Sequence, residues 1–92
     1  MLYKLTDLIA DRKTNPVDGS YTNRLLTEGE DAILRKVGEE AVEVILAAKS
    51  QGDQRLIEEA SDLIYHLLVL LASRDLSLAD IEIVLTRRHT EA

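Results

Sequence analysis

Lys36-Val-Gly-Glu-Glu-Ala-Val-Glu43 is the stretch that decides the fold, together with the later Glu59-Ala-Ser-Asp62. Neither stretch contains proline and strong helix formers surround both, so each is predicted to lie within an α-helix. Because an α-helix turns by about 100° per residue, residues three apart lie on one face. Glu40 and Glu43 therefore share a face of the first helix, and Glu59 and Asp62 share a face of the second.

The connection between the two helices is short and contains Gly52, which predicts antiparallel neighbours whose acidic faces meet. Glu39, one turn before Glu43, adds a further carboxylate to that face. Converging carboxylates repel one another unless protons or a cation neutralise them. Because oxygen is the only ligand type on offer, the pattern favours Mg²⁺ or Mn²⁺ over zinc. The sequence thus predicts a divalent-metal site between the two helices.

The composition predicts an all-α fold. Of the 92 residues, 46% are hydrophobic, the three aromatic residues are all Tyr, and there are one Pro and four Gly. An aliphatic core of this kind favours a small bundle of about four main helices over a sandwich or barrel. A chain this short buries only a modest core by itself, so we expect a homodimer to complete the bundle.

Charge and targeting signals exclude several classes of protein. The formal net charge of −6, from 11 basic and 17 acidic residues, argues against a nucleic-acid partner. The absence of Cys excludes disulfides and thiolate chemistry. The N-terminus is too acidic for a signal peptide, and the longest apolar run, residues 63–72, is far shorter than the ~18 residues of a membrane span. We therefore expect no membrane partner and a cytoplasmic protein.

Start and stop signals predict where the helices lie. Apolar periodicity predicts helices over residues 2–12, 30–50 and 54–74, and Asn15-Pro16 predicts a loop. Ser20 or Thr22 could cap a short helix that ends at Gly29. Further signals are Gly52 as a C-cap, Asp53 as an N-cap, and Ser77 with Asp80 at the start of a last helix.

The apolar residues predict which faces are buried. In helix 30–50, the residues on the inward side are Ile33, Leu34, Val37, Ala41, Val44, Ile45 and Ala48. Helix 54–74 is apolar on nearly all sides beyond Asp62, which predicts a central helix with Asp62 at the edge of its buried half. In the last helix, the residues expected to point inward are Leu78, Ile81, Val84 and Leu85.

Several polar residues beside the carboxylates are candidates for a role in catalysis, and some of them have an alternative structural role. Glu39 is the candidate general base for attack of water at phosphorus, since the sequence contains no nucleophile motif or P-loop. Lys36 either neutralises phosphate charge or pairs with Glu39 or Glu40. His66 is either a core histidine or a partner of Asp62.

Three further choices stay open at this point. Tyr65 either packs or hydrogen-bonds a carboxylate. The segment from Ser20 to Thr22 is either a helix cap or a phosphate-binding loop. A ferritin-like di-iron site is disfavoured because it requires His three residues after Glu59, where the sequence has Asp62.

With these motifs in hand, the chain resembles the phosphoribosyl-ATP pyrophosphohydrolase family of the all-α, MazG-like NTP pyrophosphatase superfamily. The acidic motifs are shared across the superfamily. Three further motifs narrow the resemblance to this family: Ser20-Tyr21-Thr22, Lys36-Val-Gly and Tyr65-His66. The matching segments are Ser20-Tyr21-Thr22, Leu25-Leu26, Gly29, Lys36 to Glu43, Glu59-x-x-Asp62, Tyr65-His66-Leu67 and Leu85-x-x-Arg88.

The resemblance implies Mg²⁺-dependent hydrolysis of 1-(5-phosphoribosyl)-ATP to 1-(5-phosphoribosyl)-AMP and pyrophosphate, in L-histidine biosynthesis. It implies metal ligands at Glu40, Glu43, Glu59 and Asp62, and a homodimeric bundle. Residues expected on the substrate side are Ser20, Tyr21, Thr22, Lys36, Tyr65, His66 and Arg88.

We expect residues 1–92 to form one domain, the stand-alone form of an enzyme that many relatives carry fused behind a cyclohydrolase. Two other readings stay open. One is a housekeeping (d)NTP pyrophosphatase with the same metal site, and the other is a non-catalytic helical oligomerisation module.

Overall fold

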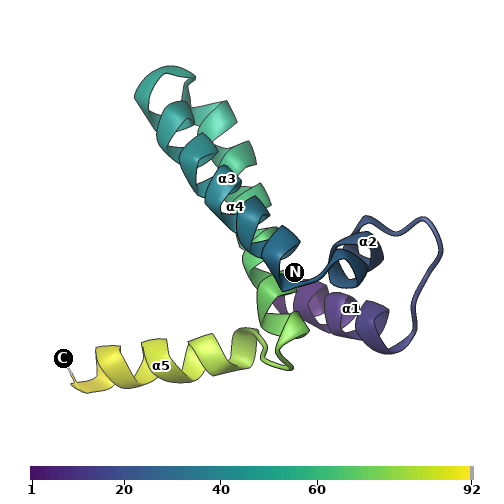
Figure 1. Ribbon diagram of the computed structural model, residues 1–92. Coiled ribbons are helices and arrows are strands. Elements are labelled where there is room, and N and C mark those ends of the chain that lie inside the picture. The colour runs from purple at the N-terminus through teal and green to yellow at the C-terminus, as the bar shows by residue number, and fades with distance from the viewer. Residues whose placement is uncertain (92) are drawn as a thin grey trace.

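The computed structural model describes the backbone of residues 1–91 and the side chains of residues 1–90, so Ala92 of the predicted domain lies outside the described residues. The predicted all-α class is confirmed, because the described residues form five helices and no strand (Figure 1). The helices are α1 (Leu2–Thr14), α2 (Tyr21–Glu28), α3 (Glu30–Ser50), α4 (Asp53–Ser73) and α5 (Leu78–Glu91). No helix in this part of the chain combines the length and apolar character that crossing a membrane requires.

Helices α3 and α4 form the antiparallel hairpin that the sequence predicts, and they lie side by side along their length (Figure 1). The chain turns at Gly52, whose φ of 88° suits a residue without a side chain. The predicted caps are wrong in detail. Gln51 is the C-cap of α3, Gly52 is the N-cap of α4, and Asp53 is the first residue of the helix. Asp53 makes no cap, but its charge still suits the positive end of the helix dipole.

The hydrophobic core lies where α1 and α2 pack against the end of the hairpin that is distant from Gly52. Its buried members come from four helices: Ile9, Leu25, Ile33, Leu68, Val69 and Ala72. Half-buried aliphatic side chains and Tyr65 surround them. The core therefore holds α2 against α3 and α4, which fixes the position of the segment that begins at Ser20.

Polar side chains fasten the loop between α1 and α2. The Asn23 amide donates to the Arg12 carbonyl at 2.7 Å and accepts from the Val17 N–H at 2.8 Å. The Lys13 ammonium donates to the Ala72 carbonyl at 3.2 Å and pairs with Asp75 at 2.6 Å. Because Lys13 satisfies carbonyls at the C-terminal end of α4, it joins the first helix to the end of the hairpin.

Helix α5 begins as predicted but does not fold back onto the bundle. The Asp80 carboxylate accepts from the Ser77 N–H at 2.9 Å, which confirms the start signal. The helix then extends away from the other four and contacts α1 near its start (Figure 1). Only Leu78 and Val84 are shielded, so the prediction that Ile81 and Leu85 point inward is wrong for a single chain, where they are 37% and 45% exposed.

The long helices expose more apolar surface than the sequence predicts. On α3, Leu34, Ile45 and Ala48 are exposed rather than buried. Helix α4 is not buried on all sides, since Ile64 is 42% exposed and Leu67 is 38% exposed. The physical reason is that a hairpin with two short helices has too few neighbours to cover both faces of each long helix. A single chain therefore leaves an apolar face uncovered.

Candidate functional site

Three carboxylates from the two long helices converge. Glu40 of α3 and Glu59 and Asp62 of α4 each offer an oxygen atom, and these atoms lie within 4.8 Å of one another. The antiparallel pairing of α3 with α4 creates this cluster, because it sets Glu40 opposite Asp62 across the hairpin. A set of carboxylate oxygens at this spacing fits a hard divalent cation.

The clustering disfavours the charged state of Glu40. Burial raises the pKa of Glu40, and the negative charge of Asp62 and a hydrogen bond with Glu59 raise the pKa further, while His66 opposes the shift. A cation bound between these oxygens would relieve the repulsion. The direction of the Glu40 shift therefore reflects burial and the crowding of negative charge among the three carboxylates.

Burial within the cluster differs from the prediction. Asp62 was expected at the edge of the buried half of α4, but its side chain is exposed, and Glu59 is the buried member at 6% exposure. Both side chains reach Glu40 of α3, but Glu59 is covered by its surroundings and Asp62 is open to solvent. The cationic partner that a buried carboxylate requires is therefore found at Glu59.

That partner is Arg55, which the sequence reasoning missed. Its guanidinium group pairs with the Glu59 carboxylate and with Glu58 at 2.7 Å. The hydrogen bond to Glu58 and the charges of Glu59 and Glu43 raise the pKa of Arg55. The spacing of four residues between Arg55 and Glu59 was the available signal, because such residues are neighbours on a helix.

Two predicted acidic residues lie outside the group of three. Glu43 is half-buried one turn further along α3, close enough to Arg55 to affect its pKa. Glu39 is exposed and pairs with the Lys36 ammonium at 3.5 Å, so the intrahelical pair is formed. The roles of Glu43 as a ligand and Glu39 as a base stay predictions.

A hydrogen-bonded chain connects α2 to the backbone of the cluster. The Tyr21 hydroxyl lies 2.9 Å from His66 Nε2, and His66 Nδ1 lies 2.7 Å from the Asp62 carbonyl oxygen. A carbonyl only accepts, so Nδ1 carries a hydrogen and, in the neutral ring, Tyr21 donates to Nε2. His66, which is buried, therefore contacts the backbone of Asp62 rather than its carboxylate.

The other residues of the Ser20 segment have structural contacts. The Ser20 hydroxyl accepts from the Asn23 N–H at 3.2 Å, so Ser20 is the N-cap of α2 and Thr22 is not. Thr22 is buried and its hydroxyl bonds the Tyr65 hydroxyl. Tyr65 thus bonds a threonine rather than a carboxylate, and its ring stacks on Tyr21 with centroids 6.2 Å apart.

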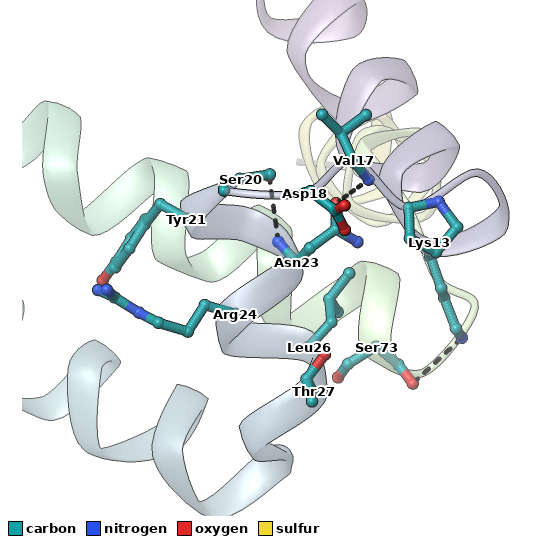
Figure 2. Close-up of a pocket in the computed structure, with 12 residues that line it drawn as sticks. Lys13, Val17, Asp18, Ser20, Tyr21, Asn23, Arg24, Leu26, Thr27 and Ser73 are labelled. Atoms are coloured by element: carbon teal, nitrogen blue, oxygen red, sulfur yellow. Dashed lines mark hydrogen bonds between the residues drawn. The ribbon is translucent and has the colours of Figure 1, made fainter.

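Two hollows flank α2. The larger, of about 850 Å³, lies between the loop after α1, α2 and the end of α4, and Figure 2 shows its walls from Lys13 and Val17 to Tyr21 and Ser73. The smaller, of about 370 Å³, lies between α2 and α3. Its lining residues are Tyr21, Arg24, Leu25, Glu28, Ala32, Arg35, Lys36 and Glu39.

A single chain does not bring Arg88 to the cluster. Arg88 lies in the last turn of α5, the helix that extends away from α3 and α4 (Figure 1). Ser20, Tyr21 and Lys36, in contrast, line the two hollows that flank α2. Within one chain, the candidate site is therefore built from residues of α2, α3 and α4.

The family profile and the relatives compared with this chain point to one family. The sequence profile described as phosphoribosyl-ATP pyrophosphohydrolase matches residues 2–89. A Listeria monocytogenes phosphoribosyl-ATP pyrophosphatase is 54% identical over 89 residues, which cover 97% of this chain and 85% of that protein. A Clostridium acetobutylicum protein of the same name is 52% identical over 89 residues, covering 97% of this chain and 81% of the relative. A Caldanaerobacter subterraneus histidine biosynthesis bifunctional protein HisIE is 52% identical over 89 residues, and the chain spans 43% of its length.

Proposed function

Since the chain belongs to the phosphoribosyl-ATP pyrophosphohydrolase family, we propose that it hydrolyses 1-(5-phosphoribosyl)-ATP to 1-(5-phosphoribosyl)-AMP and pyrophosphate, the second step of L-histidine biosynthesis. The observation that carries the proposal is the convergence of Glu40, Glu59 and Asp62, with oxygen atoms within 4.8 Å of one another. The sequence contains no cysteine and no nucleophile motif, so water is the natural nucleophile.

The family is one of metal-dependent pyrophosphohydrolases, and we propose Mg²⁺ as the ion, with Mn²⁺ as a substitute. Glu40, Glu59 and Asp62 would hold it, and Glu43, one turn along α3, would serve as a fourth ligand. Bound there, the ion would polarise the polyphosphate and neutralise charge as the anhydride bond breaks. The raised pKa of Glu40 supports this assignment, because repulsion among the three carboxylates is what a cation removes.

The chain's own residues supply the remaining steps. Water attacks phosphorus, the bond between the α- and β-phosphates breaks, and the proton of the water passes to a carboxylate. We assign that carboxylate to Glu39, which is exposed beside the cluster and whose negative charge the Lys36 ammonium stabilises. Lys36 would also face the phosphates.

The residues of α2 and α4 would orient the substrate. We propose that Tyr21, exposed at the hollows and hydrogen-bonded to His66, contacts the nucleotide, and that Ser20 lies beside it. The bond between Thr22 and Tyr65 would keep α2 in register with α4. These are positioning contacts, since none of the groups lies within the carboxylate cluster.

We further propose a cytoplasmic homodimer in which residues 1–92 form one domain. The support is the exposed apolar surface of the long helices, where Val42 is 53%, Ile45 is 62% and Ile57 is 60% exposed. Dimerisation would cover this surface. It would also give α5 a partner, and with it a route for Arg88 to reach a substrate phosphate on the second copy.

The test is release of pyrophosphate with Mg²⁺ from 1-(5-phosphoribosyl)-ATP, measured beside ATP, dCTP and dUTP. The proposal expects fast release from 1-(5-phosphoribosyl)-ATP and slow release from the others. Fast release from the simple nucleotides alone would replace the function with that of a housekeeping (d)NTP pyrophosphatase. No release from any of them would favour the non-catalytic helical module.

A further inference from the structure

The hollow between α2 and α3 gathers cations on the surface of an acidic protein. Arg24 of α2 and Arg35 and Lys36 of α3 line it, against two carboxylates, Glu28 and Glu39. The protein as a whole carries a formal net charge of −6. The local excess of positive charge is therefore opposite in sign to the rest of the molecule, which favours an anionic ligand.

Two of these cations have no carboxylate partner. Within residues 1–90, neither Arg24 nor Arg35 forms an ion pair, whereas Arg12, Arg55 and Arg74 each do. Lys36 shares its charge with Glu39 at 3.5 Å. Two guanidinium groups with all their donors available are suited to a phosphate, which they bind through paired N–H groups.

One of the arginines is held in place by an aromatic ring. The Arg24 guanidinium carbon lies 5.0 Å from the centroid of the Tyr21 ring. Figure 2 shows both side chains extending from α2 on the side away from Lys13 and Ser73. A guanidinium held over a ring loses less entropy when a ligand arrives, so Arg24 is prepared for binding.

The hollow lies near the carboxylate cluster, although Glu40, Glu59 and Asp62 do not line it. Tyr21, which lines the hollow, bonds His66, and Glu39 on its other wall directly precedes Glu40. The two sites are thus adjacent but distinct. A substrate whose anhydride lies at the carboxylates can place a second anionic group in the hollow, where its volume of about 370 Å³ gives room for a phosphorylated pentose.

We propose that this hollow binds the phosphate monoester on the second ribose of the substrate, with Arg24 and Arg35 as its main ligands. The inference rests on the proposed function and deepens it. ATP and deoxynucleoside triphosphates lack this group, so the hollow is what distinguishes the substrate from the abundant simple nucleotides. Arg24 and Arg35 are accordingly specificity-determining residues rather than catalytic ones.

The test compares the wild type with Arg35→Gln, Arg24→Gln and the conservative Arg35→Lys. Lys49→Gln is the matched control, since it removes one positive charge from the exposed last turn of the same helix, outside the lining of the hollow. The readout is the ratio of kcat/KM for 1-(5-phosphoribosyl)-ATP to that for ATP. Loss of a charge-assisted contact lowers this ratio about tenfold or more, mainly through KM. Arg35→Lys keeps the positive charge, so its ratio should lie between those of the wild type and Arg35→Gln.

A second readout does not depend on catalysis. It is the affinity for ribose 5-phosphate, measured by calorimetry. The wild type and Lys49→Gln bind it, and Arg35→Gln weakens its binding by a similar factor. A ratio that stays constant in both arginine variants would overturn the inference. If kcat/KM then falls equally for both nucleotides, the hollow binds the triphosphate instead. Arginine-dependent binding of ribose 5-phosphate by a protein that hydrolyses nothing would instead retain the phosphate site and reject the proposed function.

Discussion

Glu40 lies where its negative charge is unfavourable, and this has a consequence for stability. Burial first, and then the charge of Asp62, raise its pKa above the ordinary value of 4.5. The folded state therefore binds a proton more tightly than the unfolded state, so the stabilising contribution is complete at pH below 4.5 and is lost as the pH rises through the folded pKa.

Because folding raises the pKa of Glu40, we predict that Glu40→Gln is more stable than the wild type in metal-free buffer at pH 7. The amide cannot ionise and so avoids the unfavourable charge. The difference in Tm should shrink as the pH is lowered towards 4.5, where the wild-type carboxyl also becomes neutral. Thermal unfolding in EDTA across this pH range measures it. A Glu40→Gln variant that is less stable than the wild type at pH 7 would contradict the account of repulsion.

Arg55 is the counter-ion of the buried Glu59 carboxylate when no metal is bound. We predict that Arg55→Gln lowers the free energy of unfolding of the metal-free protein, because the buried Glu59 carboxylate is left without its cation. Saturating Mg²⁺ should reduce this loss. Denaturant titrations with EDTA and with Mg²⁺ measure both values, with Lys49→Gln as the control for general charge. An identical loss in both conditions would show that Arg55 and the metal act at separate places.

At this scale the sequence predicts the right residue types but not their environments. Spacing predicted that the carboxylates of the two helices converge, and those of Glu40, Glu59 and Asp62 do, whereas Glu43 lies outside the group. Spacing could not tell that Glu59 rather than Asp62 is buried, since that depends on what covers each side chain in the folded protein. Arg55 was detectable from its spacing to Glu59, whereas the gathering of Arg24 and Arg35 at one hollow depends on where α2 packs.

Among the elements, α2 is the one that brings substrate-side residues to the hairpin. The bond between the buried Thr22 hydroxyl and Tyr65 links it to α4. We predict that Tyr65→Phe destabilises the protein by about 1 kcal/mol, which lowers Tm by roughly 4–8 °C in a domain of this size.

Tyr3→Phe is the matched control, since Tyr3 is 49% exposed on α1, and it should leave Tm unchanged. A Thr22→Val, Tyr65→Phe double variant tests the pairing, because the two losses should not add if they remove one hydrogen bond. Full additivity would mean that the two hydroxyl groups act independently.

Helix signals in the sequence were more reliable for where elements lie than for which faces they bury. The break at Gly52 and the start at Ser77 with Asp80 were found because they depend on local chemistry. The inward side of α5 was mispredicted at Ile81 and Leu85 because apolar periodicity shows that a face is to be covered, not what covers it.

For the whole molecule, the uncovered apolar surface predicts association. We expect the protein to sediment as a dimer at about twice its chain mass of 10.3 kDa. A Val42→Glu, Ile45→Glu double variant should shift the mass to that of one chain, because two charges would have to be buried in the interface. Sedimentation equilibrium measures both. A wild type that stays monomeric at high concentration would contradict the prediction.

The central claim is that the α3 and α4 carboxylates form a divalent-metal site, and binding of Mn²⁺ tests it most directly. Free Mn²⁺ gives a six-line electron paramagnetic resonance signal that decreases when the ion binds, and Mg²⁺ should displace it. The account predicts saturable binding by the wild type, its loss in Glu40→Gln, and its retention in Lys49→Gln. Equal binding by the wild type and Glu40→Gln would contradict the assignment of Glu40, Glu59 and Asp62 as metal ligands.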